Sequence, residues 1–183
     1  MIQTVIVNFA TGELTGNIIQ STTLLSSMEG LYENEAARKA MPSDTPMYKV
    51  QVHEPDASAE GGLLFGTSFI NPGLVGEEYF MTKGHYHNKR DTAEYYWCIS
   101  GQGMLLLMDE NSETTWQEMK PGVLCYIPRR VAHRLVNTGD NILTIGACWP
   151  SDAGHDYGSI REKGFGVRVK KINGEPKVIK NHD

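Results

Sequence analysis

From Pro42 onward, turn-forming residues divide the sequence into short apolar runs. The runs are rich in valine, isoleucine, leucine, tyrosine and threonine, which favour strands, and glycine, proline, asparagine or aspartate separate them. Many short strands in succession are typical of an antiparallel barrel or jelly roll, so we expect an all-β fold. The runs lie near residues 47–53, 62–70, 78–86, 94–100, 103–108, 114–118, 123–127, 133–137, 141–149 and 166–172.

Three short sequences between these runs have the composition of tight turns. Glycine and proline often mark turns, and asparagine, aspartate and serine tolerate turn conformations. We therefore expect hairpins at Gly101–Gly103, Asp109–Ser112 and Lys120–Gly122.

The only convincing helical stretch lies within residues 19–42. Ser21 or Thr22 is expected to cap a short turn, and Asn34 to cap a helix over residues 35–41. The length of 183 residues lies in the ordinary range of one domain, and no internal linker interrupts the chain. We predict a single domain over 1–183, with an N-terminal extension at 1–45, a barrel at about 46–172 and a C-terminal tail that ends with His182 and Asp183.

Composition excludes several classes of partner. With 40% hydrophobic and 21% charged residues the chain is typical of a soluble protein, and no apolar run approaches the length needed to span a membrane. The first residues lack the basic segment of a signal peptide, so we expect the cytoplasm. A net charge of -5 disfavours nucleic acid. The three cysteines, Cys98, Cys125 and Cys148, lie in apolar runs and are expected to be reduced core residues.

Two histidines separated by one residue, His85 and His87, are the first indication of a chemical site. On an extended segment their side chains project to the same face. Glu94 begins the next strand-like run and His133 follows a proline turn, so two further strands can each deliver one ligand. Three imidazoles and one carboxylate favour a mid-row divalent ion over a structural zinc and leave octahedral positions open for water or substrate.

The alternation of strand side chains extends this site. Glu94, Tyr96 and Cys98 share one face of their run, so a Glu94 that points to the metal places Tyr96 in the same cavity. His133 and Leu135 form a comparable inward set, together with Asn137.

The motifs around these residues resemble those of the cupin superfamily. Gly84-His85-Tyr86-His87, Glu94 and Gly101 resemble its first motif, and Gly122, Pro128, His133 and Asn137 its second. Arg130 stands where the second motif commonly has glycine, and the spacing from His87 to Glu94 is longer than usual. That spacing occurs in the cupin-type (archaeal-type) glucose-6-phosphate isomerases. The chain also resembles this family in the phrases at 82–87 and 151–158, and the likeness is dense over about 66–165.

The resemblance implies a cupin jelly roll with short N-terminal helical segments. It also implies a metal-dependent aldose–ketose isomerase that interconverts glucose 6-phosphate and fructose 6-phosphate in glycolysis and gluconeogenesis. The implied cofactor is a divalent ion, first Fe²⁺, with Mn²⁺, Ni²⁺ or Co²⁺ as alternatives and Zn²⁺ less suited. Cupins of this kind are usually homodimers, so a homodimer is expected.

The resemblance also assigns expected site residues. Thr82 and Gly84 match phosphate-contacting positions, Ser68 stands where the family has threonine, and Trp149 where it commonly has tyrosine. A threonine hydroxyl with backbone N–H groups can hold an anion without a large net charge. The expected metal ligands are His85, His87, Glu94 and His133, the expected catalytic residues are Glu94 and Tyr96, and the expected substrate-binding residues are Tyr48, Ser68, Thr82, Gly84, Trp149, His155 and Tyr157.

Two other functions remain open at this point. An iron- or manganese-dependent dioxygenase uses the same ligand set, and a non-catalytic sugar- or sugar-phosphate-binding cupin uses the same fold. The polar residues of the expected phosphate site favour the isomerase, because a phosphosugar needs them and an apolar oxygenase substrate does not. The sequence also leaves open whether Glu94 serves as a base as well as a ligand, or whether a hydride shift replaces proton transfer.

Overall fold

The computed structural model describes residues 4–57 and 59–181 and places many more of them in strands than in helices. Residues 1–3, at the start of the predicted extension, and residues 182–183, at the end of the predicted tail, lie outside the described residues. The prediction of an all-β jelly roll with short N-terminal helical segments is confirmed.

The largest sheet has six strands, and neighbouring strands are antiparallel. In spatial order they are β11 (Leu124–Ile127), β8 (Glu94–Ser100), β13 (Leu143–Pro150), β5 (Leu63–Ile70), β4 (Pro46–His53) and β3 (Ile19–Leu24). A three-stranded sheet consists of β10 (Thr114–Met119), β9 (Gly103–Met108) and β12 (Ala132–Asn137).

Two smaller sheets complete the strands. One contains β15 (Glu175–Lys180), β14 (Val167–Ile172), β7 (Glu78–Tyr79) and β6 (Leu74–Val75), and the other β1 (Val5–Val7) and β2 (Leu14–Gly16). The helical elements are α1 (Glu35–Ala40), the 3-10 turn η1 (Leu25–Met28) and α2 (Gly158–Lys163). No helix among the described residues has the length and apolar character that crossing a bilayer requires.

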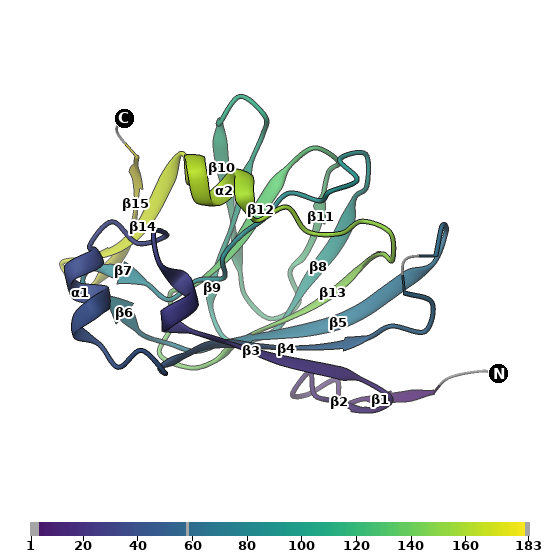
Figure 1. Cartoon of the computed structure of the whole chain (residues 1–183). Coiled ribbons are helices and arrows are strands. Elements are labelled where there is room, and N and C mark those ends of the chain that lie inside the picture. The colour runs from purple at the N-terminus through teal and green to yellow at the C-terminus, as the bar shows by residue number, and fades with distance from the viewer. Residues whose placement is uncertain (1–3, 58, 182–183) are drawn as a thin grey trace.

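The main core lies between the two larger sheets. Figure 1 shows β9, β10 and β12 above β3, β4 and β5, with α2 close to β12. Met47, Ile70 and Ile145 of the six-stranded sheet belong to the same buried cluster as Leu105 and Leu135 of the three-stranded sheet. Apolar side chains from both inner faces therefore hold the sheets together, as in other two-layer β proteins.

Two expectations about the chain ends need correction. The predicted turn capped by Ser21 or Thr22 is wrong, because residues 19–24 form β3, which pairs with β4, and only η1 follows it. The threonines at 22 and 23 are β-branched and suit an edge strand. The segment after residue 174 is not a bare tail, since β15 pairs with β14 along its whole length. The helix predicted over 35–41 is confirmed as α1, which ends one residue earlier, and the Asn34 side chain accepts a hydrogen bond from the Ala37 N–H at 2.9 Å.

One of the three expected hairpins forms. Residues 109–112 join β9 to β10, which pair with each other. The expected hairpins at 101–103 and 120–122 are wrong, because β8 and β11 belong to the six-stranded sheet and β9 and β10 to the other. These glycine-containing turns instead carry the chain from one layer to the next.

Candidate metal centre and anion site

A cavity of about 240 Å³ is lined by the six-stranded sheet, by β12 and by two segments without regular structure. Residues 82–85 form one segment, and residues 155 and 157 belong to the other. Every predicted site residue except His87 lines this cavity. The structure therefore brings the predicted metal and substrate residues into one place, although they come from distant parts of the chain.

The candidate ligand atoms of His85, His87, Glu94 and His133 all lie within 4.8 Å of one another. Glu94 is the first residue of β8, and His133 is the second residue of β12. His85 pairs with His133 as an antiparallel bridge, with N···O distances of 3.2 and 3.0 Å. Backbone pairing thus places the two histidine rings side by side, and their centroids are 4.3 Å apart.

The environment of these atoms fits a cation. Nε2 of each of the three histidines and Oε1 of Glu94 are buried and have no hydrogen-bond partner. His133 Nε2 and Glu94 Oε1 contact each other at 2.5 Å, and no group of the described residues outside this cluster pairs with any of the four atoms. Leaving a buried polar atom unpaired costs about 1–3 kcal/mol, and four such atoms at one point are explained by a shared ligand. Imidazole nitrogens with a carboxylate oxygen suit a divalent ion.

Hydrogen bonds behind His87 fix its tautomer. The Thr92 hydroxyl donates to the Lys89 carbonyl at 2.7 Å and lies 2.8 Å from His87 Nδ1. Because the hydroxyl proton is already used, Thr92 accepts from Nδ1–H, which leaves the Nε2 lone pair directed at the cluster. Such outer partners orient metal-binding histidines in general.

The charge states of the buried groups are consistent with a metal site. Burial acts to raise the pKa of Glu94, but the imidazoles of His133 and His87 outweigh it and hold the pKa at about 2. Burial lowers the pKa of His85 well below its usual value, so its ring is neutral, the form that binds metals. Burial and the neighbouring Glu94 carboxylate raise the pKa of Tyr96 well above its usual value. Tyr96 is therefore a neutral phenol beside an ionised carboxylate.

Residues 82–84 form a bulge opposite β12. Met81 pairs with Val136 and His85 with His133, so three residues on one side face two on the other. The Leu135 N–H donates to Thr82 Oγ1 at 3.1 Å instead of to a carbonyl. Gly84 has φ +72° and no room for a side chain, because an added Cβ would lie 2.7 Å from the Phe165 ring. The bulge therefore requires glycine and turns residues 82–84 toward the cavity.

A loop after β13 supplies His155 and Tyr157, whose rings stack with centroids 5.7 Å apart. Asp156 between them anchors the loop. Its backbone pairs with Tyr86, and its carboxylate accepts a hydrogen bond from Arg90 Nη2 at 2.7 Å. The anchor holds the His155 ring 4.4 Å from that of His85, at the edge of the metal cluster.

Four polar residues that sequence analysis did not assign to the site also line the cavity. They are Ser21, Thr23, Thr67 and Lys83. Lys83 is the only lysine or arginine among the lining residues that the structure describes, and its place between Thr82 and Gly84 could have identified it. Ser21 and Thr23 could not be found without knowing that residues 19–24 form a strand.

Comparison with known proteins gives one family. The model of the family described as glucose-6-phosphate isomerase (GPI) matches residues 24–183. The glucose-6-phosphate isomerase of Pyrococcus furiosus is 44% identical over 177 residues, which cover 96% of this chain and 93% of that protein. The enzyme of the same name from Thermococcus gammatolerans is 45% identical over 158 residues, 86% of this chain and 83% of that protein. A bacterial one, from Sinorhizobium medicae, is 38% identical over 149 residues, 80% of this chain and 69% of that protein.

The matches to solved structures are weaker. An oxalate oxidase has a TM-score of 0.47 and 13% identity, covering 56% of this chain and 49% of that one. The oxalate decarboxylase of Bacillus subtilis has a TM-score of 0.47 and 19% identity, covering 61% of this chain and 28% of that one.

Proposed function

The chain belongs to the glucose-6-phosphate isomerase family, and we propose that it interconverts glucose 6-phosphate and fructose 6-phosphate in the cavity beside His85. The observation that supports the proposal most directly is that a candidate metal site and a candidate anion site share one cavity. Three of the four candidate metal ligands, His85, Glu94 and His133, line the same cavity as the bulge at 82–84, and His85 directly follows the bulge in the chain. A hexose phosphate has hydroxyl or carbonyl oxygens at one end and a phosphate at the other, which suits these two sites.

We assign His85, His87, Glu94 and His133 as the ligands of a divalent ion. When bound, the ion supplies Lewis-acid polarisation of the substrate oxygens at C1 and C2. Fe²⁺ is our first choice, with Mn²⁺, Ni²⁺ or Co²⁺ as alternatives. Zn²⁺ is less suited, because it favours tetrahedral sites that the four protein ligands would fill.

We assign Thr82, Gly84 and Ser68 to the phosphate end, with Lys83 as the cation. Thr82 Oγ1 accepts from the Leu135 N–H, so its own proton is available for an anion. Tyr48, Trp149, His155 and Tyr157 complete the wall around the sugar. Burial raises the pKa of Tyr157 to about 12, so it meets the substrate as a hydrogen-bond donor.

The isomerisation moves a hydrogen between adjacent carbons. A Glu94 with pKa about 2 is a weak base, and ligation weakens it further. Two routes are compatible with this arrangement. In one, Glu94 takes the proton from one carbon and returns it to the other, while Tyr96 gives a proton to the oxygen that becomes a hydroxyl and regains one from the oxygen that becomes a carbonyl. In the other, a hydride moves directly between the carbons while a proton moves between the same two oxygens.

We further propose a homodimer that works in the cytoplasm, where phosphorylated hexoses are metabolised. The edge strand β11 exposes Leu124 and Tyr126, and the Tyr126 ring packs 5.3 Å from that of Tyr95, which supports an apolar contact surface on this side. Light scattering at micromolar concentration should give twice the chain mass, and a monomeric mass would contradict the dimer.

The proposed function is tested by incubating metal-loaded protein with fructose 6-phosphate and measuring glucose 6-phosphate. Formation of the product at a rate that depends on His133 is expected, and unphosphorylated fructose should be a poor substrate. Absence of product would contradict the isomerase. Oxygen consumption with an organic substrate in the same preparation would support a dioxygenase instead.

A further inference from the structure

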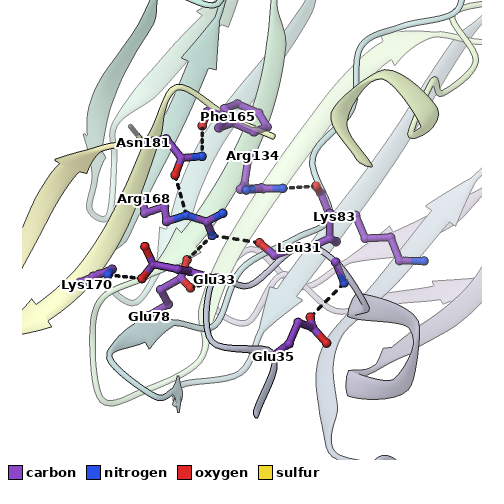
Figure 2. A network of polar contacts seen from close by, with 11 residues as sticks. Leu31, Glu33, Glu35, Glu78, Lys83, Arg134, Phe165, Arg168, Lys170 and Asn181 are labelled. Carbon is purple, nitrogen blue, oxygen red and sulfur yellow. Dashed lines mark hydrogen bonds and ion pairs between the residues drawn. The ribbon is translucent and has the colours of Figure 1, made fainter. Parts of the chain in front are cut away.

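Arg134 is a buried cation behind the bulge. It follows His133 in β12, and because side chains alternate along a strand, it leaves β12 on the face opposite the cavity. Only 4% of its surface is exposed. The guanidinium lies over the Phe165 ring at 4.5 Å and reaches toward Lys83, as Figure 2 shows.

The partners of Arg134 differ from those of Arg168 nearby. Arg168 donates to Glu78 at 2.8 Å and to Asn181 at 2.9 Å, so its charge is matched by a carboxylate. Arg134 donates from Nη2 to the Lys83 carbonyl at 2.6 Å, and its Nε has no partner. Among residues 4–57 and 59–181, no carboxylate forms an ion pair with it. A buried charge that forms no ion pair is costly, which points to a role other than stability.

The bond to Lys83 determines where the next N–H points. The Lys83 carbonyl and the Gly84 N–H belong to one planar trans peptide, so they point in opposite directions. Since the carbonyl faces Arg134, the N–H faces away from it, on the side of the cavity that Gly84 lines. Within the part of the chain that the structure describes, no hydrogen bond uses the Gly84 N–H.

We propose that Arg134 is a positioning residue that holds the Lys83–Gly84 peptide with its N–H toward the cavity, as a donor to the anionic group of the substrate. The proposal rests on the proposed function, because it describes how the phosphate end of that site is built. A hydrogen bond from a charged donor polarises the peptide and strengthens the N–H at its other end. Arg134 thereby acts on the anion through the backbone without occupying the cavity.

The test compares Arg134→Gln with Arg168→Gln in metal-loaded protein. Arg134→Gln should raise the KM for fructose 6-phosphate and the inhibition constant of inorganic phosphate by roughly 10-fold or more, the order expected for loss of a charge-assisted hydrogen bond. Its kcat and metal content should stay close to those of the parent. Arg168→Gln, which alters the same network away from residues 82–84, should lower the melting temperature and leave both constants unchanged.

Three results would overturn the proposal. They are an unchanged inhibition constant in folded, metal-loaded Arg134→Gln, an equal rise in Arg168→Gln, and a loss of metal that accounts for the effect. If Arg134→Gln does not fold, Arg134→Met, which keeps an unbranched side chain but deletes every donor, is judged by the same constants, and parent-like values overturn the proposal.

Titration calorimetry with inorganic phosphate separates this proposal from the isomerase assignment. A parent that binds phosphate but does not convert fructose 6-phosphate would refute the isomerase. Weaker binding by Arg134→Gln than by Arg168→Gln would still support the role of Arg134.

Discussion

The two ends of the cavity are built differently. At the metal end, the site consists of side chains, and four candidate ligand atoms from β8, β12 and the segment 85–87 lie within 4.8 Å of one another. At the anion end, a glycine-dependent bulge, hydroxyl groups and one lysine form the site. A site made of side chains depends on a few residues that no other type can replace. A site made of backbone groups depends instead on the neighbouring residues that hold the peptide in its orientation.

The largest expected effect is the loss of a metal ligand. His87→Ala or His133→Ala should remove bound metal and lower kcat/KM by more than about 1000-fold, since Lewis-acid stabilisation is worth several kcal/mol. His53→Ala is the matched control, because His53 lies on β4 outside the cavity. Metal analysis, far-UV circular dichroism and kinetics check the prediction. Unfolding of either variant at room temperature would show that the cluster is structural.

A smaller effect is expected when one hydroxyl is removed from the anion end. Thr82→Val keeps the side-chain shape but deletes a donor to phosphate, so the KM for fructose 6-phosphate should rise roughly 10- to 150-fold at unchanged metal content. Thr115→Val on the exposed face of β10 is the control. If Thr82→Val, Ser68→Ala and Tyr157→Phe all retain the parental KM, the anion end has been placed wrongly.

The hydrogen bond behind the metal cluster should matter somewhat less. Thr92→Val removes the hydroxyl that accepts from the His87 Nδ1–H and leaves only the longer contact with the Thr92 carbonyl, at 3.2 Å, so it should weaken metal affinity by about 10- to 100-fold. Thr92→Ser keeps the hydroxyl and should restore most of it. A metal titration that gives the same affinity for all three proteins would mean that Thr92 does not orient His87.

The smallest expected effect concerns the loop that carries His155 and Tyr157. Hydrogen bonds from Ser159, together with Arg90, lower the pKa of Asp156. Asp156→Asn should therefore cost about 1 kcal/mol, or about 2–4 °C in melting temperature. Because the pKa is lower in the folded state, this stabilisation is present above the unfolded value of about 3.9 and is lost as pH falls through the folded value. Equal melting temperatures for the parent and the variant at pH 7 would show that Asp156 does not anchor the loop.

Much of the fold could be predicted because strand composition and turn residues are local signals. Most strands from 46–53 to 167–172 follow the apolar runs closely, but the run expected near 78–86 forms a strand only at 78–79. The alternation along β8 predicted that Glu94 and Tyr96 share a face, and both line the cavity. The turns at 101–103 and 120–122 were misassigned because composition marks a reversal but not which sheet receives the next strand.

The site was predictable to the extent that it consists of side chains in motifs. The candidate metal cluster of His85, His87, Glu94 and His133 could be predicted, because metal ligands must be particular residue types at particular spacings, and the structure brings the four residues together. The contact of Arg134 with the Lys83 carbonyl could not be found, since it depends on a bulge whose register only the three-dimensional structure defines. Ser21 and Thr23 were not predicted as lining residues for a related reason, because the polar strand β3 has no apolar run to mark it.

The central claim is that the metal cluster and the anion site act on one phosphosugar. The most direct test follows glucose 6-phosphate formation from fructose 6-phosphate by verified metal-free protein during titration with Fe²⁺ in the absence of oxygen. We predict no activity at the start and a rise that saturates at about one equivalent of metal per chain, as expected for a tight site with one ligand set. Full activity in the metal-free protein would contradict the account.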